Sequence, residues 1–336
     1  MKAFPRLAAV TVAGVALPFA LACCGTAESK RAVDARTEVV RFYGVDAPAV
    51  AMLGNEPADD LASLDRAAAG LPAWSQLRAA LLGPLRNAGI GAPELARLMR
   101  PHEEIEGVSA ASLAVGIPGT GPLSPRRLLV VLVSDQTDLL DQLLGRSVAE
   151  GTIRRAGTLH DAKLYSGDSG AYAARDGVLV AAADRTTVRA ALRRRDGDSD
   201  AQLDEDVVKG VLGELRIDGP LDVYANVDSV IESDPGLAAI AAGTPWLRAL
   251  RQGALTARPT GAALRLEVAV RTRGDLPESE LPATGTPDPF TLTPDDVAGR
   301  LGAGDPAGAL LRGITPLEGS ATASADEVRA QAVPAP

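Results

Sequence analysis

The segment LLVVLVSDQTDLLDQLLG, residues 128–145, contains two different hydrophobic periods. Its first part, up to Val133, is a continuous aliphatic run, which is typical of a β-strand. Its second part has the period of an α-helix. Asp135 lies between them, where a carboxylate can accept hydrogen bonds from the free N–H groups of a helix N-terminus and favour the helix dipole. The segment therefore predicts a strand, an N-capping aspartate and a helix.

The same unit recurs twice along the chain. GVLVAAADRTTVRAALRR (177–194) has Asp184 at the junction, and LDVYANVDSVIES (221–233) has Asp228 there. The units are too unevenly spaced for a solenoid. We interpret them as related elements of one antiparallel sheet with helices packed on one face, an α+β fold in which Asp135, Asp184 and Asp228 are structural helix N-caps.

Turn signals define two hairpins. Apolar runs flank Asp176-Gly177 within residues 170–184, and a second pair flanks Pro259-Thr260-Gly261 within residues 253–272. The pattern predicts further strands at 37–45, 50–54, 111–119 and 126–135, with a strand pair around His160-Asp161. It predicts helices at 59–70, 72–90 and 93–99, the second one kinked or ended early by Pro84.

Three segments resemble a known family: LLVVLVSDQTDLLDQLL, AKLYSGDSGAYAARDGVLVAAADRTTVRAAL and ALRLEVAVRT. They are similar to stretches of domain of unknown function 3352, found in envelope proteins of actinobacteria and some other bacteria. The resemblance covers roughly residues 37–275. This family has no established activity and no catalytic residues, so the resemblance implies a fold and a location but no chemistry.

The N-terminus has the pattern of a secretory signal. Lys2 and Arg6 precede an uncharged apolar run over 7–22, and small residues lead into Cys23 and Cys24, which are the chain's two cysteines. This ending resembles the lipobox of bacterial lipoproteins, in which the cysteine sulfur receives a diacylglycerol and the signal is then cut just before that cysteine. We favour Cys23 because small Ala22 precedes it, and Cys24 is the alternative. An ordinary signal peptide or membrane anchor with incidental cysteines stays open.

Four regions follow from these patterns. Residues 1–22 are the lipoprotein signal peptide, 23–36 a polar tether and 37–275 the α+β domain. Residues 276–336 are rich in Pro, Gly and acidic residues at their start, and we interpret them as a linker and a weakly ordered tail. Within this tail, residues 291–301 are compatible with a short helix.

Composition excludes some classes of partner. Without residues 1–22 the chain has 32 basic and 43 acidic side chains, a net charge of −11, because Lys2 and Arg6 are removed. Such a surface argues against nucleic acid and against electrostatic adhesion to anionic lipids. Aromatic residues are only 3% of the chain, which leaves few stacking platforms. We therefore expect contact with the membrane through the lipid anchor alone.

Candidate catalytic and metal-binding groups are sparse. Gly167-Asp168-Ser169-Gly170, with His160 upstream, resembles the nucleophile loop of chymotrypsin-like proteases, but a simple turn uses the same residues. His102 beside Glu103 and Glu104, and His160 beside Asp161, offer too few ligands for zinc. We therefore predict no catalytic residue, no metal and no cofactor.

Three other motifs have ordinary structural interpretations. The stretch from Gly116 to Gly121 lacks the Lys-Ser/Thr of a phosphate loop and is predicted to be a loop. Arg193-Arg194-Arg195 is interpreted as a solvated helix C-terminus. Asp204, Glu205 and Asp206 lack the calcium-loop pattern and are interpreted as surface.

These observations favour a membrane-anchored lipoprotein outside the cytoplasm. Its expected function is non-enzymatic binding or scaffolding in the cell envelope, with an envelope protein as partner. The alternative is a carrier of a lipid or other apolar ligand at the membrane surface, since an aliphatic-rich body can enclose a cavity. A serine hydrolase using Ser169 and His160 ranks third.

Overall fold

The computed structural model divides the chain into two units, 1–31 and 32–336, and every residue described below belongs to the second. The structure describes residues 34–53, 57–68, 72–101, 110–121, 124–197, 202–215, 219–242, 248, 250–260, 263–272, 321–324 and 327–332. The helices are α1 (Ala35–Val40), α2 (Pro57–Ala67), α3 (Pro72–Asn87), α4 (Ala92–Leu98), α5 (Thr137–Ala149), α6 (Arg185–Arg195), α7 (Glu205–Leu212), α8 (Val227–Ser233) and α9 (Pro235–Ala242), with a 3-10 helix η1 (Pro125–Arg127).

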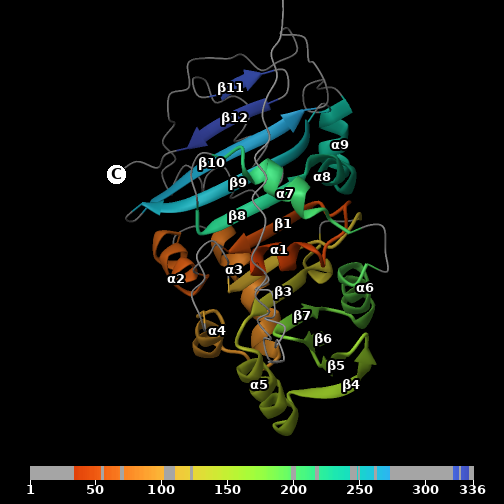
Figure 1. Cartoon of the computed structure of the whole chain (residues 1–336). Helices are drawn as coiled ribbons and strands as arrows, with labels where there is room; N and C mark the ends of the chain where they lie inside the picture. The colour runs from red at the N-terminus through yellow and green to blue at the C-terminus, as the bar shows by residue number, and fades with distance from the viewer. Residues whose placement is uncertain are drawn as a thin grey trace, which may run out of the picture. The chain divides into compact units, whose positions relative to one another are not determined.

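The strands of the described residues form one 12-stranded antiparallel sheet in the order β11-β12-β10-β9-β8-β1-β2-β3-β7-β6-β5-β4 (Figure 1). The predicted α+β class with an antiparallel sheet is confirmed. The strands are β1 (Ala49–Leu53), β2 (Ala111–Gly116), β3 (Leu129–Ser134), β4 (Ile153–Leu159), β5 (Ala162–Gly167), β6 (Gly170–Arg175), β7 (Val178–Ala182), β8 (Leu221–Asn226), β9 (Leu250–Thr260), β10 (Ala263–Thr272), β11 (Ala321–Ser324) and β12 (Glu327–Ala332).

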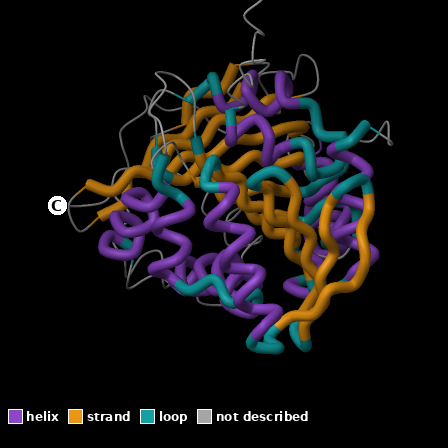
Figure 2. Tube along the Cα trace, turned by 60° about the horizontal axis from the view of Figure 1, so that its bottom comes forward, coloured by secondary structure: helices purple, strands orange, loops and turns teal. Residues whose placement is uncertain are grey.

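Helices cover both faces of the sheet, so the expectation of one covered face is wrong (Figure 2). α2, α3, α4 and α5 pack on one face, which we call the leucine face, and α1, α6 and α7 pack on the other, the valine–alanine face. In β3, for example, Leu132 points to the leucine face and Val131 to the opposite one. The continuous apolar run of β3 reflects this double burial, because a strand with one solvated face would alternate.

Two of the predicted strand–helix units place their helices on opposite faces of the sheet. β3 leads into α5 and β7 leads into α6, and these two strands are antiparallel neighbours with Leu132 opposite Leu179. Because the two strands are antiparallel, the C-terminal end of β3 lies beside the N-terminal end of β7, and the chain leaves the two strands in opposite directions. α5 then packs on the leucine face through Leu143, whereas α6 packs on the other face through Val188.

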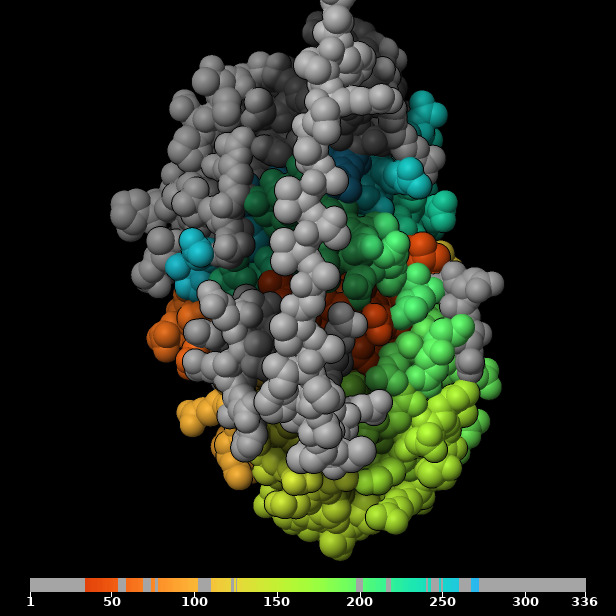
Figure 3. Space-filling view, viewed as in Figure 1, coloured from red at the N-terminus to blue at the C-terminus, as the bar shows by residue number. Residues whose placement is uncertain are grey.

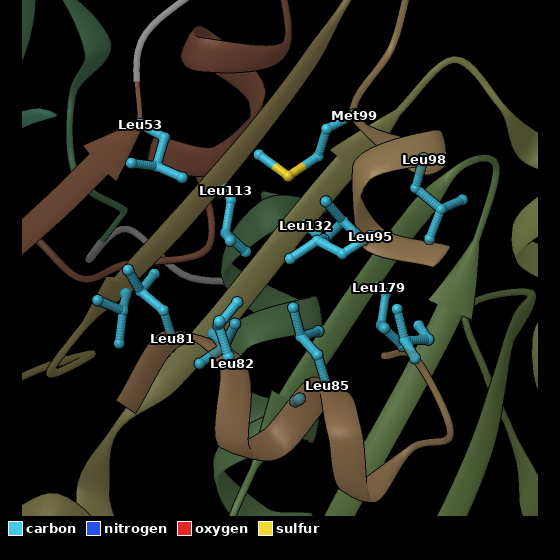
Figure 4. Packing of buried hydrophobic residues seen from close by; sticks show 14 of the residues in the cluster. Leu53, Leu81, Leu82, Leu85, Leu95, Leu98, Met99, Leu113, Leu132 and Leu179 are labelled. Carbon is cyan, nitrogen blue, oxygen red and sulfur yellow. The ribbon is translucent and has the colours of Figure 1, made fainter. Parts of the chain in front are cut away.

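The core of the leucine face is a layer of leucines from α3, α4 and the central strands (Figure 4). Leu81 and Leu85 of α3 are 1% and 0% exposed, and Leu98 of α4 is 0% exposed. Gly89, just after α3, has φ +81° and lies so close to the Ser147 side chain of α5 that a β-carbon there would overlap it. Ser147 Oγ donates to Ala88 O at 2.8 Å, so this close approach ties α5 to the end of α3.

One local prediction is wrong, and another is wrong in one of its two alternatives. Residues 37–45 were expected to be a strand, but Ala35–Val40 is helix α1, in which the Asp34 side chain accepts a hydrogen bond from Arg36 N and Val39 is buried against the sheet. This burial outweighs the β-propensity of the paired valines. The predicted early end of helix α3 at Pro84 is wrong, since Leu85 is fixed in the core and Ala88 N still donates to Pro84 O at 3.1 Å. The alternative, a kink at Pro84, stays a prediction.

The C-terminal region adds strands that the sequence pattern did not predict. β12 pairs with β10, with Val268 opposite Ala330, and β11 pairs with β12. The interpretation of 276–336 as a linker and weakly ordered tail therefore omitted two strands of the sheet, while the proposed helix at 291–301 lies outside the described residues. A third, small cluster of Ala241, Leu250 and Val270 joins α8 and α9 to β9 and β10.

Candidate functional site

A polar cavity of about 250 Å³ lies between helix α6 and the loop that follows strand β2. The helix lies at the right of Figure 1, and its residues belong to the green surface at the right of Figure 3. The cavity is therefore formed on the valine–alanine side of the sheet, where α6 packs. Its lining residues are Asp46, Pro118, Gly119, Thr120, Arg127, Thr186, Thr187, Ala190 and Arg194.

The loop over residues 117–121 is held in place by hydrogen bonds from two sides. Asp46 Oδ2 accepts a hydrogen bond from Thr120 N at 2.9 Å. Arg127 Nη2 donates to Thr120 O at 2.5 Å and to Gly119 O at 3.3 Å. Gly44 N donates to Pro118 O at 2.9 Å. The predicted loop is thus a fixed wall of the cavity, since these bonds leave its backbone little freedom.

Helix α6 forms the opposite wall with one of its faces. Thr186, Ala190 and Arg194 are spaced four residues apart and therefore follow one another along the helix. The helix begins at Asp184, whose carboxylate accepts from Thr187 N and Thr187 Oγ1, both at 2.8 Å. Burial alone would raise the pKa of Asp184, but the hydrogen bonds from Thr187 and Thr186 outweigh it and lower the pKa. The capped first turn fixes the positions of both threonines.

Arg194 has unsatisfied hydrogen-bonding capacity. Its side chain is half-buried, and within the described part of the chain its Nη1 atom is buried with no hydrogen-bond partner. Burial lowers the pKa of Arg194, and the nearby Asp46 carboxylate opposes this effect. A buried donor without an acceptor is unusual. Because Nη1 is closed to water, a solute in the cavity would meet the other part of this guanidinium group, which lines the cavity.

Gly119 lets the two charged groups of the cavity come close to the loop. A β-carbon at this position would lie 3.3 Å from Asp46 Oδ1 and 3.6 Å from Arg194 Nη2. The carboxylate and the guanidinium therefore both approach the backbone of Gly119, without forming an ion pair within 4 Å. With Arg127 included, the cavity has two guanidinium groups and one carboxylate, a net charge of +1, beside threonine hydroxyls. Such a set of groups can bind a polar solute by charge-assisted hydrogen bonds.

The sequence analysis treated Arg193-Arg194-Arg195 as one solvated group, and the structure separates the three. Arg193 is exposed, Arg194 lines the cavity, and Arg195 Nε donates to Glu38 Oε1 at 2.7 Å. Successive residues of a helix point about 100° apart, so three in a row cannot share one solvated face. This spacing rule could have indicated from the sequence that one of the three arginines, here Arg194, does not lie on the solvated face.

The three aspartates predicted as N-caps have different positions. Asp184 is the N-cap residue of α6. Asp135 is not the N-cap of α5, because the helix begins one residue later with Gln136 as cap and no side-chain cap hydrogen bond. Asp228 lies in the first turn of α8. The N-cap of this helix is Asn226, whose Oδ1 accepts a hydrogen bond from Ser229 N at 3.1 Å. The hydrophobic pattern locates a junction only to within a residue or two, which is too coarse for a cap.

The residues of the hydrolase hypothesis are far apart. His160 lies in the turn between β4 and β5, and Ser169 lies in the turn between β5 and β6. These turns are at opposite ends of the six-residue strand β5, which is roughly 20 Å long at about 3.3 Å per residue. His160 and Asp161 both have positive φ, as a tight turn requires. The arrangement is that of two hairpin turns and offers no nucleophile–base contact.

The acidic run Asp204-Glu205-Asp206 is used for structure. Asp204 is the N-cap of α7 and accepts from Asp206 N at 2.9 Å, while Glu205 is 3.5 Å from the Arg41 guanidinium. Nowhere in the described ranges do three or more His, Cys, Asp or Glu side chains gather as metal ligands do. The other predicted site residues, Cys23, Cys24 and His102 with Glu103 and Glu104, lie outside the described residues.

Comparison with known proteins gives limited information. No family model and no curated protein matches the chain. Among solved structures, crystal form III of TP0453 is 8% identical with a TM-score of 0.42, over 87% of this chain and 91% of that one. Crystal form I of TP0453 is also 8% identical, with a TM-score of 0.40 over 90% and 93% of the two chains. Likeness at this level supports no inference about function. Among the helices of the described residues, none combines the length and apolar character of a membrane span.

Proposed function

We propose that the chain is a lipid-anchored, non-enzymatic binding protein of the cell envelope, located outside the cytoplasm. The single observation behind the binding role is the cavity beside α6, which presents guanidinium, carboxylate and hydroxyl groups to a solute. Ser169 and His160, the residues considered for catalysis, lie at opposite ends of β5. The envelope location and the anchor follow from the signal pattern that ends at Cys23 and Cys24, and the resemblance to domain of unknown function 3352 agrees with them.

The alternative function, a carrier of a lipid or other apolar ligand, has less structural support. Such a carrier needs an apolar cavity of several hundred cubic ångströms. The space beside Phe42, Val180 and Leu192 has mainly apolar walls, with Arg175 and Arg195 at its side, but a volume of only about 10 Å³, enough for a single water molecule. A polar ligand therefore fits the described pockets better than a lipid does.

Cell fractionation tests the anchor. We expect Cys23→Ala to move the protein from the membrane fraction to the soluble fraction and to abolish labelling by a radioactive fatty acid. Two or more acyl chains hold a protein on a membrane stably, and none remains in this variant. Cys24→Ala is the matched control, because it changes the neighbouring thiol, and it should stay labelled and membrane-bound.

The other outcomes are equally informative. If only Cys24→Ala releases the protein, Cys24 is the lipidated residue. If the wild type takes up no fatty-acid label and the double variant Cys23→Ala/Cys24→Ala still sediments with membranes, the lipid anchor is wrong, and the ordinary membrane-anchor alternative replaces it.

A further inference from the structure

We infer that the cavity between α6 and loop 117–121 binds a small polar solute through an oxyanion group, a phosphate or a carboxylate, with Arg194 as its main anchor. The inference rests on the binding role proposed above but does not depend on the lipid anchor. It concerns a site that neither the sequence pattern nor the family resemblance indicated.

The strongest support is the unused capacity of Arg194. A guanidinium has five N–H donors and no acceptor, and it matches the geometry of carboxylate and phosphate oxygens. Within the described ranges the Arg194 side chain makes neither a hydrogen bond nor an ion pair within 4 Å, and this side chain lines the cavity. A bound oxyanion would supply the missing acceptors and the opposite charge.

The surrounding groups favour an anion over a cation. Arg127 adds a second positive charge to the wall, although its Nη2 is already hydrogen-bonded to the loop. Thr186 presents a hydroxyl from the exposed side of the first turn of α6. The cavity thus has a net positive charge in a chain whose overall net charge is −9, so it is a local site of attraction for an anion.

Asp46 indicates what else the ligand contains. Its Oδ2 is occupied by Thr120 N, but a carboxylate oxygen can accept more than one hydrogen bond, and the group lies beside Arg194 across Gly119. A bare anion would be repelled by this carboxylate, whereas a ligand with a hydroxyl next to its acidic group would donate to it. The volume of about 250 Å³ limits the ligand to a small molecule, of the size of a three-carbon phosphate or hydroxy acid.

Isothermal titration calorimetry on the full-length protein in detergent micelles tests the inference. The probes are inorganic phosphate, glycerol 3-phosphate and lactate, titrated at constant ionic strength with sodium chloride as the reference salt. We expect saturable binding with one site per chain, tighter for glycerol 3-phosphate or lactate than for inorganic phosphate. If glycerol 3-phosphate binds more tightly than lactate, the natural ligand carries a phosphate. If lactate binds more tightly, the ligand carries a carboxylate.

Variants on the same helix locate the site. Arg194→Gln should weaken binding about tenfold or more, the size of a charge-assisted hydrogen bond. Ala190→Asp should abolish binding by adding a negative charge to the wall, and it tests the site independently should Arg194→Gln fold poorly. Arg189→Gln is the matched control, because Arg189 is exposed on α6 and does not line the cavity.

Two results would overturn the inference: no saturable binding of any probe to the wild type, or equal affinities in Arg194→Gln, Ala190→Asp and Arg189→Gln. Neither result affects the fractionation experiment, so a wrong ligand class and a wrong anchor are distinguishable.

Discussion

The face of the sheet covered by α2, α3, α4 and α5 is packed mainly with leucine, whereas the face covered by α1, α6 and α7 is packed with valine and alanine. The second face also contains buried charges. Glu38 of α1 is 4% exposed and pairs with Arg195 of α6, and Asp222 of β8 is 7% exposed and pairs with Arg36 of α1. Burial raises the pKa of Glu38, against the opposing effect of the Arg41 and Arg175 guanidinium groups.

The two kinds of packing have different consequences for stability and for the positions of the helices. Leucine packing removes much apolar surface from water and contributes stability without any polar requirement. Buried ion pairs contribute less net stability, because desolvation offsets their attraction, but they fix the positions of the helices that make them. The cavity lies beside α6, which is one of the helices fixed in this way. We therefore expect substitutions on the leucine face to affect stability most and those around α6 to affect binding most.

Truncation of one leucine on each face gives the largest expected effect. Leu85→Ala on α3 should lower the free energy of unfolding by about 2–5 kcal/mol, because Leu85 is fully buried among other leucines. Leu192→Ala on α6 should fall near the lower end of that range, since Leu192 already borders a small empty space. Urea unfolding of both variants measures the difference. A larger loss for Leu192→Ala would contradict the contrast between the two faces.

Removal of the partner of Glu38 should have an intermediate effect that depends on pH. Arg195→Leu should cost about 1.5–3 kcal/mol near pH 7, because it leaves a buried carboxylate without its charge-assisted hydrogen bond. The variant should raise the pKa of Glu38 further. A group whose pKa is raised on folding contributes stability below its unfolded pKa and loses it as pH rises through the folded pKa. The loss in Arg195→Leu should therefore grow from pH 4.5 to pH 7.

The double variant Glu38→Gln/Arg195→Leu is the control for this effect, because it has no carboxylate to titrate. The difference in free energy of unfolding between this double variant and Glu38→Gln should not vary with pH over the same interval. A loss in Arg195→Leu that is equal at all pH values would show that the ion pair is not the cause.

The helix caps give the smallest expected effect. Asp184→Ala should cost about 1 kcal/mol, since the carboxylate caps α6 through Thr187. Gln136→Ala, at the N-cap of α5 on the leucine face, should change stability by less than about 0.5 kcal/mol because Gln136 makes no side-chain cap hydrogen bond. Thermal unfolding of the pair compares the two caps. Equal losses would mean that the Asp184 cap does not stabilise α6.

The parts of the fold that the sequence predicts are those with strong local signals. Asp176 and Gly177 form the turn between β6 and β7 with positive φ at both residues, as the Asp-Gly sequence predicts. The run 128–133 forms a strand followed by a helix. The parts that fail depend on distant contacts. α1 is helical because Val39 packs against the sheet, and α3 does not end at Pro84 because Leu85 is fixed by the core.

The candidate site was less predictable than the fold. Its residues come from four separate segments, namely Asp46, the loop 118–120, Arg127 and one face of α6, and each has an ordinary role when considered alone. Only the pairing of β1 with β2 and the packing of α6 on the sheet place Asp46 and Arg194 across Gly119.

The amino-acid sequence by itself determined the α+β class and the hairpin turn at Asp176-Gly177, because hydrophobic period and turn chemistry are local properties of the chain. The N-terminal signal stays a prediction from the charged start of an apolar run. The tertiary structure decided which faces are covered, which of three neighbouring arginines is solvated, and where a cavity remains. These features depend on side chains far apart in sequence that share limited space, and their positions follow only when all the elements pack together.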